Sequence, residues 1–161
     1  MTSTTPGTEP STTPTTDLRG TDLRSADLRS ADLRDTDLRS TVERFWATAE
    51  ERDWTAFAET LAEDVVYELP QTRERIRGRE RYVEFNREYP GDWHARVERI
   101  VAEPGQREQA VSRTHVTVGS EEMYAITFFT GDEDGRIVAI TDFWPEPYEP
   151  PAGREHLVER Y

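Results

Sequence analysis

The stretch Gly135-Arg-Ile-Val-Ala-Ile-Thr-Asp-Phe-Trp-Pro145 predicts a β-strand that follows a tight turn and ends at a proline. Alternation along this strand places Val138, Ile140, Asp142 and Trp144 on one face. The opposite face is also largely apolar, so Asp142 is an acid among hydrophobic neighbours whichever way it points. Burial of this kind disfavours the charged form and raises the pKa of a carboxyl group. Asp142 is therefore the first candidate for acid/base chemistry.

Three further segments upstream are rich in β-branched and aromatic residues and are separated by short turns. The turn sequences are Pro104-Gly105, Gly119-Ser120 and Asp132-Glu-Asp-Gly135. Such short connections join antiparallel neighbours. The second half of the chain is therefore predicted to be a meander of four strands, at Trp93–Val101, Gln109–Val118, Met123–Thr130 and Arg136–Trp144.

The segment before the meander has the period of α-helices, with one strand inserted. Apolar residues from Val42 recur at helical spacing, and Ser40 or Thr41 is expected to cap that helix. A second helix is predicted from Trp54 to Leu61 with Asp53 as its cap, and a third from Arg79 to about Glu88. The segment Asp64–Pro70 predicts a strand, and residues 71–75 a turn.

The first 40 residues have a different composition from the rest. Residues 1–16 are almost wholly Thr, Ser, Pro, Gly and Glu, and are expected to be disordered because they bury little apolar surface. Residues 16–40 repeat the unit small-Asp-Leu-Arg-small five times, which resembles the pentapeptide-repeat family. Five units make too short a solenoid to stand alone, so residues 17–40 are expected to form a mobile or partly helical arm. A docking or assembly role is the alternative.

Several motifs in the order of the predicted elements resemble the SnoaL-like, polyketide cyclase-like branch of the nuclear transport factor 2 family. They are Asp64-Val-Val-Tyr-Glu-Leu-Pro, Ile76-Arg-Gly-Arg-Glu, Phe85-Asn-Arg-Glu-Tyr-Pro-Gly-Asp-Trp-His94, Gly135-Arg-Ile-Val138 and Asp142-Phe-Trp-Pro145. The resemblance implies an α+β fold in which a cone-shaped, curved antiparallel sheet wraps around three N-terminal helices. The predicted domain spans residues 41–148, and residues 149–161 form a proline-rich C-terminal tail.

Charge and composition narrow the classes of function. The net charge is −13, and residues 1–40 contribute −2 from five Arg, six Asp and one Glu, so residues 41–161 carry −11. This charge disfavours nucleic acids and anionic membrane surfaces as partners. There is no cysteine, no metal-ligand spacing and no glycine-rich phosphate loop, so neither a metal nor a cofactor is expected. A cytoplasmic location is expected.

The resemblance and the strand pattern together suggest a set of site residues. Asp142 occupies the position that resembles the acid/base Asp of the SnoaL-like cyclases, and His115 is a candidate proton shuttle. Candidates for ligand binding are Tyr67, Tyr124, Trp46, Phe85 and Trp144. In the alternative interpretation Asp142 pairs with Arg113 or Arg96 across the sheet or faces a partner subunit, and the histidine and the aromatic side chains are structural.

Two functions remain open at this point. The first is a cofactor-independent enzyme of the isomerase, cyclase or hydratase type that moves a proton next to the carbonyl group of a small hydrophobic compound. The second is a non-catalytic ligand-binding or scaffold domain of the same fold. The resemblance implies a homodimer in either case.

Overall fold

The computed structural model describes residues 1–2, 37–102 and 109–161. The chain divides into two units, Met1–Arg34 and Asp35–Tyr161, and the second contains every helix and strand of the described residues. Most of the expected disordered tail at residues 1–16 and most of the expected repeat arm at residues 17–40 lie outside the described residues.

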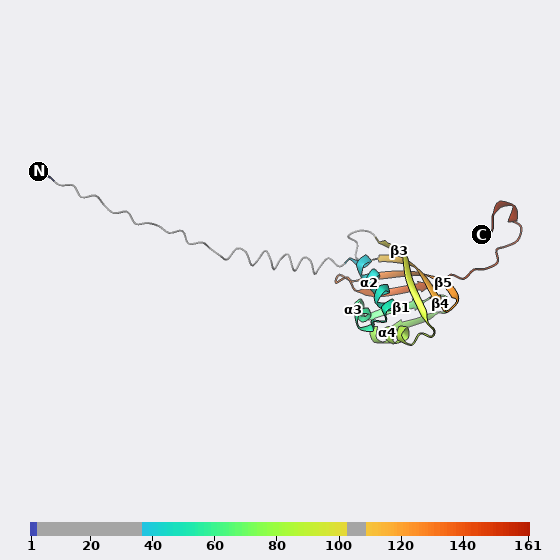
Figure 1. The fold of residues 1–161 in the computed structure, drawn as a ribbon, viewed down its shortest axis with the longest axis horizontal. Helices are drawn as coiled ribbons and strands as arrows, with labels where there is room; N and C mark the ends of the chain where they lie inside the picture. The colour runs from blue at the N-terminus through green and yellow to red at the C-terminus, as the bar shows by residue number, and fades with distance from the viewer. Residues whose placement is uncertain (3–36, 103–108) are drawn as a thin grey trace. The chain divides into compact units, whose positions relative to one another are not determined.

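The described residues form three α-helices and one six-stranded sheet (Figure 1). The helices precede most of the sheet in the chain, and the strand order β2-β1-β6-β5-β4-β3 leaves two free edges, so the curved sheet does not close. The α+β class predicted from the sequence is confirmed. The helices are α2 (Leu38–Glu51), α3 (Trp54–Glu59) and α4 (Arg79–Arg87), and the strands are β1 (Leu61–Leu69), β2 (Glu74–Arg77), β3 (Trp93–Ala102), β4 (Gln109–Val118), β5 (Glu121–Gly131) and β6 (Ile137–Phe143).

Helix α2 begins earlier than predicted. Its N-cap is Asp37, whose carboxylate accepts a hydrogen bond from the backbone N–H of Ser40 at 2.7 Å. The prediction that Ser40 or Thr41 caps this helix is therefore wrong, and Leu38 already lies in the core with none of its surface exposed. The predicted cap at Asp53 is confirmed, since its side chain accepts from the N–H of Ala56 at 3.0 Å.

The sheet is antiparallel except at one pair. Strand β1 runs parallel to β6, with Tyr67 opposite Ile140 and Glu68 opposite Thr141. The curved antiparallel sheet that the resemblance implies therefore contains one parallel pair, between two strands that are far apart in the chain and are not joined by a hairpin. Residues 71–73 form the predicted turn, while residues 74 and 75 already belong to the short strand β2, which pairs with β1.

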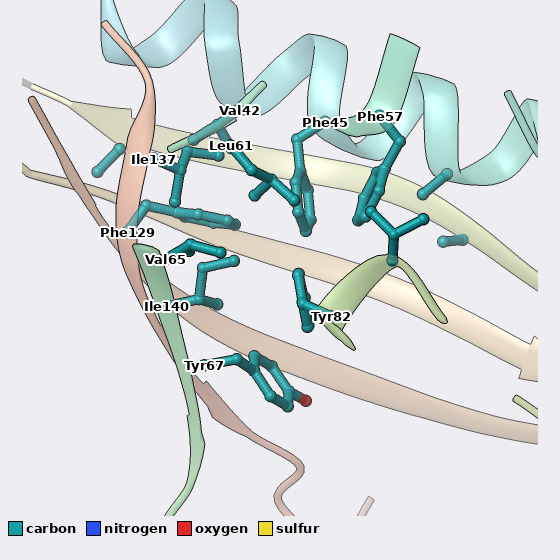
Figure 2. Packing of buried hydrophobic residues seen from close by; sticks show 14 of the residues in the cluster. Val42, Phe45, Phe57, Leu61, Val65, Tyr67, Tyr82, Phe129, Ile137 and Ile140 are labelled. Carbon is teal, nitrogen blue, oxygen red and sulfur yellow. The ribbon is translucent and has the colours of Figure 1, made fainter. Parts of the chain in front are cut away.

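The core lies between helices α2 to α4 and one face of the sheet. Figure 2 shows Val42 and Phe45 of α2 and Phe57 of α3 pointing toward Phe129, Ile137 and Ile140 of the strands. The ring of Phe45 lies 4.7 Å from that of Phe57 and 5.4 Å from that of Phe129, measured between ring centres. This aromatic packing joins the helices to the sheet.

The first helix is also tied to the turn before β6. The hydroxyl of Thr41 donates to the carbonyl oxygen of Gly135 at 2.7 Å in a buried setting. Asp132 holds the same turn by accepting from the N–H groups of Asp134 and Arg136 at 2.9 and 2.8 Å, and Gly135 supplies the positive φ of 78° that the turn needs. These bonds fix where β6 starts.

The cap assignment can be tested by substitution. We expect Asp37→Ala to lower the free energy of unfolding by about 1 kcal/mol, because the N–H groups at the start of α2 lose their acceptor. Ser40→Ala, at the exposed position that the sequence pattern favoured as cap, should change it by less than about 0.5 kcal/mol. Urea unfolding of the two variants and the wild type measures both values, and a larger loss for Ser40→Ala would contradict the assignment.

Candidate functional site

Asp142 is a buried acid with three hydrogen-bond donors. Its side chain is 4% exposed. The Thr127 hydroxyl donates to Oδ1 at 2.7 Å, while the Tyr67 hydroxyl and the indole N–H of Trp144 donate to Oδ2 at 3.2 and 3.1 Å. The alternative that Asp142 pairs with Arg113 or Arg96 is wrong, since both of those side chains bond to Glu98.

The strand pairings place these donors. Thr127 lies directly opposite Asp142 in the antiparallel β5–β6 pair, so their side chains share a face. Tyr67 lies opposite Ile140 in the parallel β1–β6 pair, and its ring packs 4.6 Å from that of Tyr82 of α4. Burial raises the pKa of the Tyr67 hydroxyl well above its usual value, so this group keeps its proton and remains a donor.

Trp144 is held by a two-way contact with Gln71. The Gln71 amide donates to the backbone carbonyl of Trp144 at 2.7 Å, and its oxygen accepts from the backbone N–H of Trp144 at 2.9 Å. Gln71 follows β1 and Trp144 follows β6, so the contact links the segments just beyond two neighbouring strands. It fixes the backbone from which the Trp144 indole reaches Asp142.

Burial dominates the protonation of Asp142. Loss of water around the carboxylate raises its pKa, and the hydrogen bonds from Thr127, Tyr67 and Trp144 offset only part of that rise. The net result is a pKa of about 6 in place of 3.8. The direction agrees with the expectation from the sequence. A carboxyl group with this pKa can both accept and release a proton near neutral pH.

Asp142 opens into a pocket of about 430 Å³ between the helices and the concave face of the sheet. Aromatic rings form much of its wall, and Trp46, Tyr67, Phe85 and Trp144 are among them, as the sequence suggested. Trp46 is fixed by a hydrogen bond from its indole N–H to the buried hydroxyl of Ser112 at 3.0 Å. The pocket is of the size that binds a small, largely hydrophobic molecule.

The structure places His115 and Tyr124 on the other face of the sheet, apart from Asp142. They lie opposite each other in the β4–β5 pair with ring centres 5.2 Å apart, while the flanking Thr114 and Val116 point to the helices and are buried. Arg113 covers the Tyr124 ring at 4.2 Å. A proton relay from His115 to Asp142 is therefore wrong, because the pleat sends the two side chains to opposite faces.

The sequence did not single out Thr127, Gln71 or Tyr82 as site residues. Thr127 could be found only from the β5–β6 register, which pairs it with Asp142. Gln71 lies in a segment predicted to be a turn, and Tyr82 appeared only as an apolar member of the third helix. Burial raises the pKa of Tyr82, so its hydroxyl also keeps its proton.

The described residues hold neither a metal-binding cluster nor a membrane-spanning helix. Within residues 37–102 and 109–161, no three His, Cys, Asp or Glu side chains gather in a way that could hold a metal ion. No helix in the same part of the chain is long and apolar enough to span a membrane.

The fold and the enclosed acid define a class of small α+β domains with a pocket between helices and a curved sheet. Residues 42–140 match the family model of the SnoaL-like domain, and the chain belongs to this family. Residues 16–42 match the model of pentapeptide repeats. No curated protein matches the chain.

Three solved structures illustrate the likeness. A proposed ketosteroid isomerase from Kribbella flavida is 48% identical with a TM-score of 0.73, over 77% of this chain and 89% of that one. An NTF-2 like protein of unknown function from Burkholderia xenovorans is 22% identical with a TM-score of 0.65, over 80% and 98%. A proposed polyketide cyclase from Pseudomonas putida is 21% identical with a TM-score of 0.55, over 68% and 92%. The second and third show the fold alone.

The raised pKa of Asp142 predicts a distinctive dependence of stability on pH. The folded state holds a proton on Asp142 up to about pH 6, whereas the unfolded chain releases it near 3.8. Folding is therefore favoured below this window and loses up to about 3 kcal/mol as the pH rises through it. Asp142→Asn mimics the neutral acid and should lack this loss.

The measurement is urea unfolding of the wild type and Asp142→Asn from about pH 4 to about pH 7. Other carboxylates titrate in both proteins, so the difference between the two curves isolates Asp142. The variant should gain stability relative to the wild type as the pH rises. A constant difference would contradict a raised pKa.

Proposed function

We propose that this protein is a cofactor-independent enzyme that moves a proton next to the carbonyl group of a small hydrophobic compound. The observation that carries the proposal is a carboxyl group with a pKa of about 6, inside an aromatic pocket of about 430 Å³. The likeness to a proposed ketosteroid isomerase supports it, since that reaction class acts on a hydrophobic ketone. An isomerase, a cyclase or a hydratase would each use this group.

The reaction would use Asp142 first as a base and then as an acid. Its carboxylate takes a proton from the carbon beside the carbonyl, and the electron pair of that C–H bond moves to form an enol or enolate. The protonated Asp142 then returns the proton to another atom of the same molecule. Such transfer by a positioned side chain accounts for rate factors of roughly 10² to 10⁴.

The carbonyl oxygen needs a donor as charge develops on it. Tyr82 and Asn86, both on α4, line the same pocket and carry polar hydrogens. The raised pKa of Tyr82 keeps its hydroxyl protonated. We propose the Tyr82 hydroxyl for the role, with the second N–H of the Asn86 amide beside it, because the Tyr67 hydroxyl already donates to Asp142. The first N–H of Asn86 donates to the backbone carbonyl of Tyr82 at 2.8 Å.

A non-catalytic ligand-binding domain is the second candidate. It is favoured by one observation, namely that Thr127, Tyr67 and Trp144 already occupy both carboxylate oxygens of Asp142. A carboxylate satisfied in this way can be a structural polar group inside the pocket. The two candidates differ in whether Asp142 exchanges its proton with a ligand.

Deuterium exchange separates the two candidates. With tetralone, a fused-ring ketone, in D₂O, the wild type should speed exchange of the protons beside the carbonyl, as followed by NMR. Asp142→Asn should reduce this rate by at least about 10²-fold, because the base is lost, while binding of the ketone changes little. His115→Gln is the control and should exchange at the wild-type rate. Ketone binding without any enzyme-dependent exchange would favour the binding domain.

We also propose a homodimer formed through the outer face of the sheet. Val101, Val111, Phe128 and Thr141 lie opposite one another across β3, β4, β5 and β6. Val101 is 54% exposed and Phe128 is 47% exposed, so this row presents apolar surface to water. Exposed apolar patches of this kind often mark protein interfaces.

Phe128→Arg should convert the dimer to a monomer, because a second copy would have to bury the new charge. Sedimentation equilibrium measures the mass of the wild type and the variant. Tyr148→Arg changes an aromatic residue of the C-terminal tail that is 82% exposed, and should leave the mass unchanged. A monomeric wild type would contradict the proposed dimer.

A further inference from the structure

The pocket carries more negative charge than acid/base chemistry requires. Besides Asp142, the carboxylates of Glu74 on β2 and Glu146 beyond β6 line it. Both of these residues are exposed, so they mark the end of the pocket that is open to solvent. Among the described residues that form the wall, none is an arginine, although arginine supplies all the basic residues of the chain.

The alternation of side chains along β2 places one of these carboxylates, that of Glu74, in the pocket. Glu74 lies opposite Leu69, and Leu69 also lines the pocket, so Glu74 shares the pocket face of the β1–β2 pair. Arg75 lies opposite Glu68 on the other face and binds it, with Nη2 2.6 Å from Oε1. In this strand Glu74 therefore faces the pocket, and its neighbour Arg75 faces away from it.

The Glu74 carboxylate is engaged only in part. The hydroxyl of Thr72 donates to its Oε2 at 2.6 Å. Among the described residues Glu146 forms no ion pair, and none of the ion pairs there joins Glu74 to an arginine. Two carboxylates that line the same pocket favour a cation over an anion as its ligand.

The rest of the wall also favours a cation. Aromatic rings from α2, α4 and β1 border the pocket, together with Tyr89, which follows α4, and Trp144, which follows β6. Trp93 of β3 borders it too, but the Arg52 guanidinium already lies over its ring, 3.6 Å from the ring centre. The faces of such rings attract ammonium groups through their quadrupoles. The net charge of −13 adds a field that draws cations toward the protein and repels anions.

We propose that the ligand of this pocket is a hydrophobic molecule that carries an ammonium group, which lies beside Glu74 and Glu146 at the open end. This inference rests on the proposed function, in that the carbonyl group of the same molecule would lie beside Asp142. The same charges disfavour carboxylates and phosphate-bearing thioesters as ligands.

Binding of three probes of equal shape tests the charge of the ligand. Naphthylmethylammonium, naphthylmethanol and naphthoate share one aromatic body and differ in charge. Calorimetry with the full chain should show the ammonium binding about tenfold more tightly than the alcohol, and the naphthoate more weakly than both. Added salt should narrow these differences because the carboxylates at the open end are exposed.

Two variants and one control locate the effect. Glu74→Gln and Glu146→Gln should each weaken binding of the ammonium about threefold and leave binding of the alcohol unchanged. Glu68→Gln is the control, because it removes the same charge from the outer face of the neighbouring strand. It should change neither the affinity for the ammonium nor that for the alcohol. Equal affinity for ammonium and alcohol, or equal effects of Glu68→Gln and Glu74→Gln, would overturn the inference.

These outcomes can be told apart from failure of the proposed function. The probes lack a carbonyl with exchangeable neighbouring protons, so they report binding alone, whereas the tetralone exchange reports the work of Asp142. Exchange with no preference for the ammonium would overturn the inference and leave the enzyme proposal standing. A preference for the ammonium with no exchange would support the charge of the ligand and contradict the proposed enzyme activity.

Discussion

Strand β6 runs parallel to β1 in the middle of the sheet, and the pocket depends on this pairing. The N–H of Ile137 donates to the carbonyl of Thr60 at 2.9 Å where the two strands begin, and Tyr67 lies opposite Ile140 further along. The register fixes the distance between the Tyr67 hydroxyl and Asp142. A shift by one residue would turn every side chain of β6 to the other face and remove the acid from the pocket.

The surroundings of Asp142 balance two opposing effects. Burial alone would make the ionised form costly, whereas three donors stabilise it, and the result is a pKa of about 6 rather than a permanently neutral acid. This balance needs donors that are fixed in place. Gln71 fixes one of them, the indole of Trp144, by bonding to the Trp144 backbone. No buried side-chain N or O atom of the described residues lacks a partner, so the site is held by satisfied bonds.

Most elements could be predicted from the sequence because their periods are clear. The four strands of the meander and the cap at Asp53 are examples, and the apolar pattern around Asp142 was enough to predict its burial. Register and face could not be predicted in the same way. Alternation assigns His115 and Thr127 each to one of two faces but does not say which face meets the helices. Strand β2 has one apolar residue, Ile76, and pairing with β1 rather than its own pattern makes it a strand.

The last unit of the repeat contributes three side chains to the folded domain. In the unit Thr36-Asp-Leu-Arg-Ser40, Asp37 caps α2, Leu38 is fully buried, and Arg39 donates to the carbonyl of Ile100 at 2.9 Å. The Asp, the Leu and the Arg of the unit therefore all contribute to the domain. A small-Asp-Leu-Arg unit suits a helix start because Asp is a strong N-cap and Leu a good helix former. The repeat pattern therefore continues into the first turn of α2.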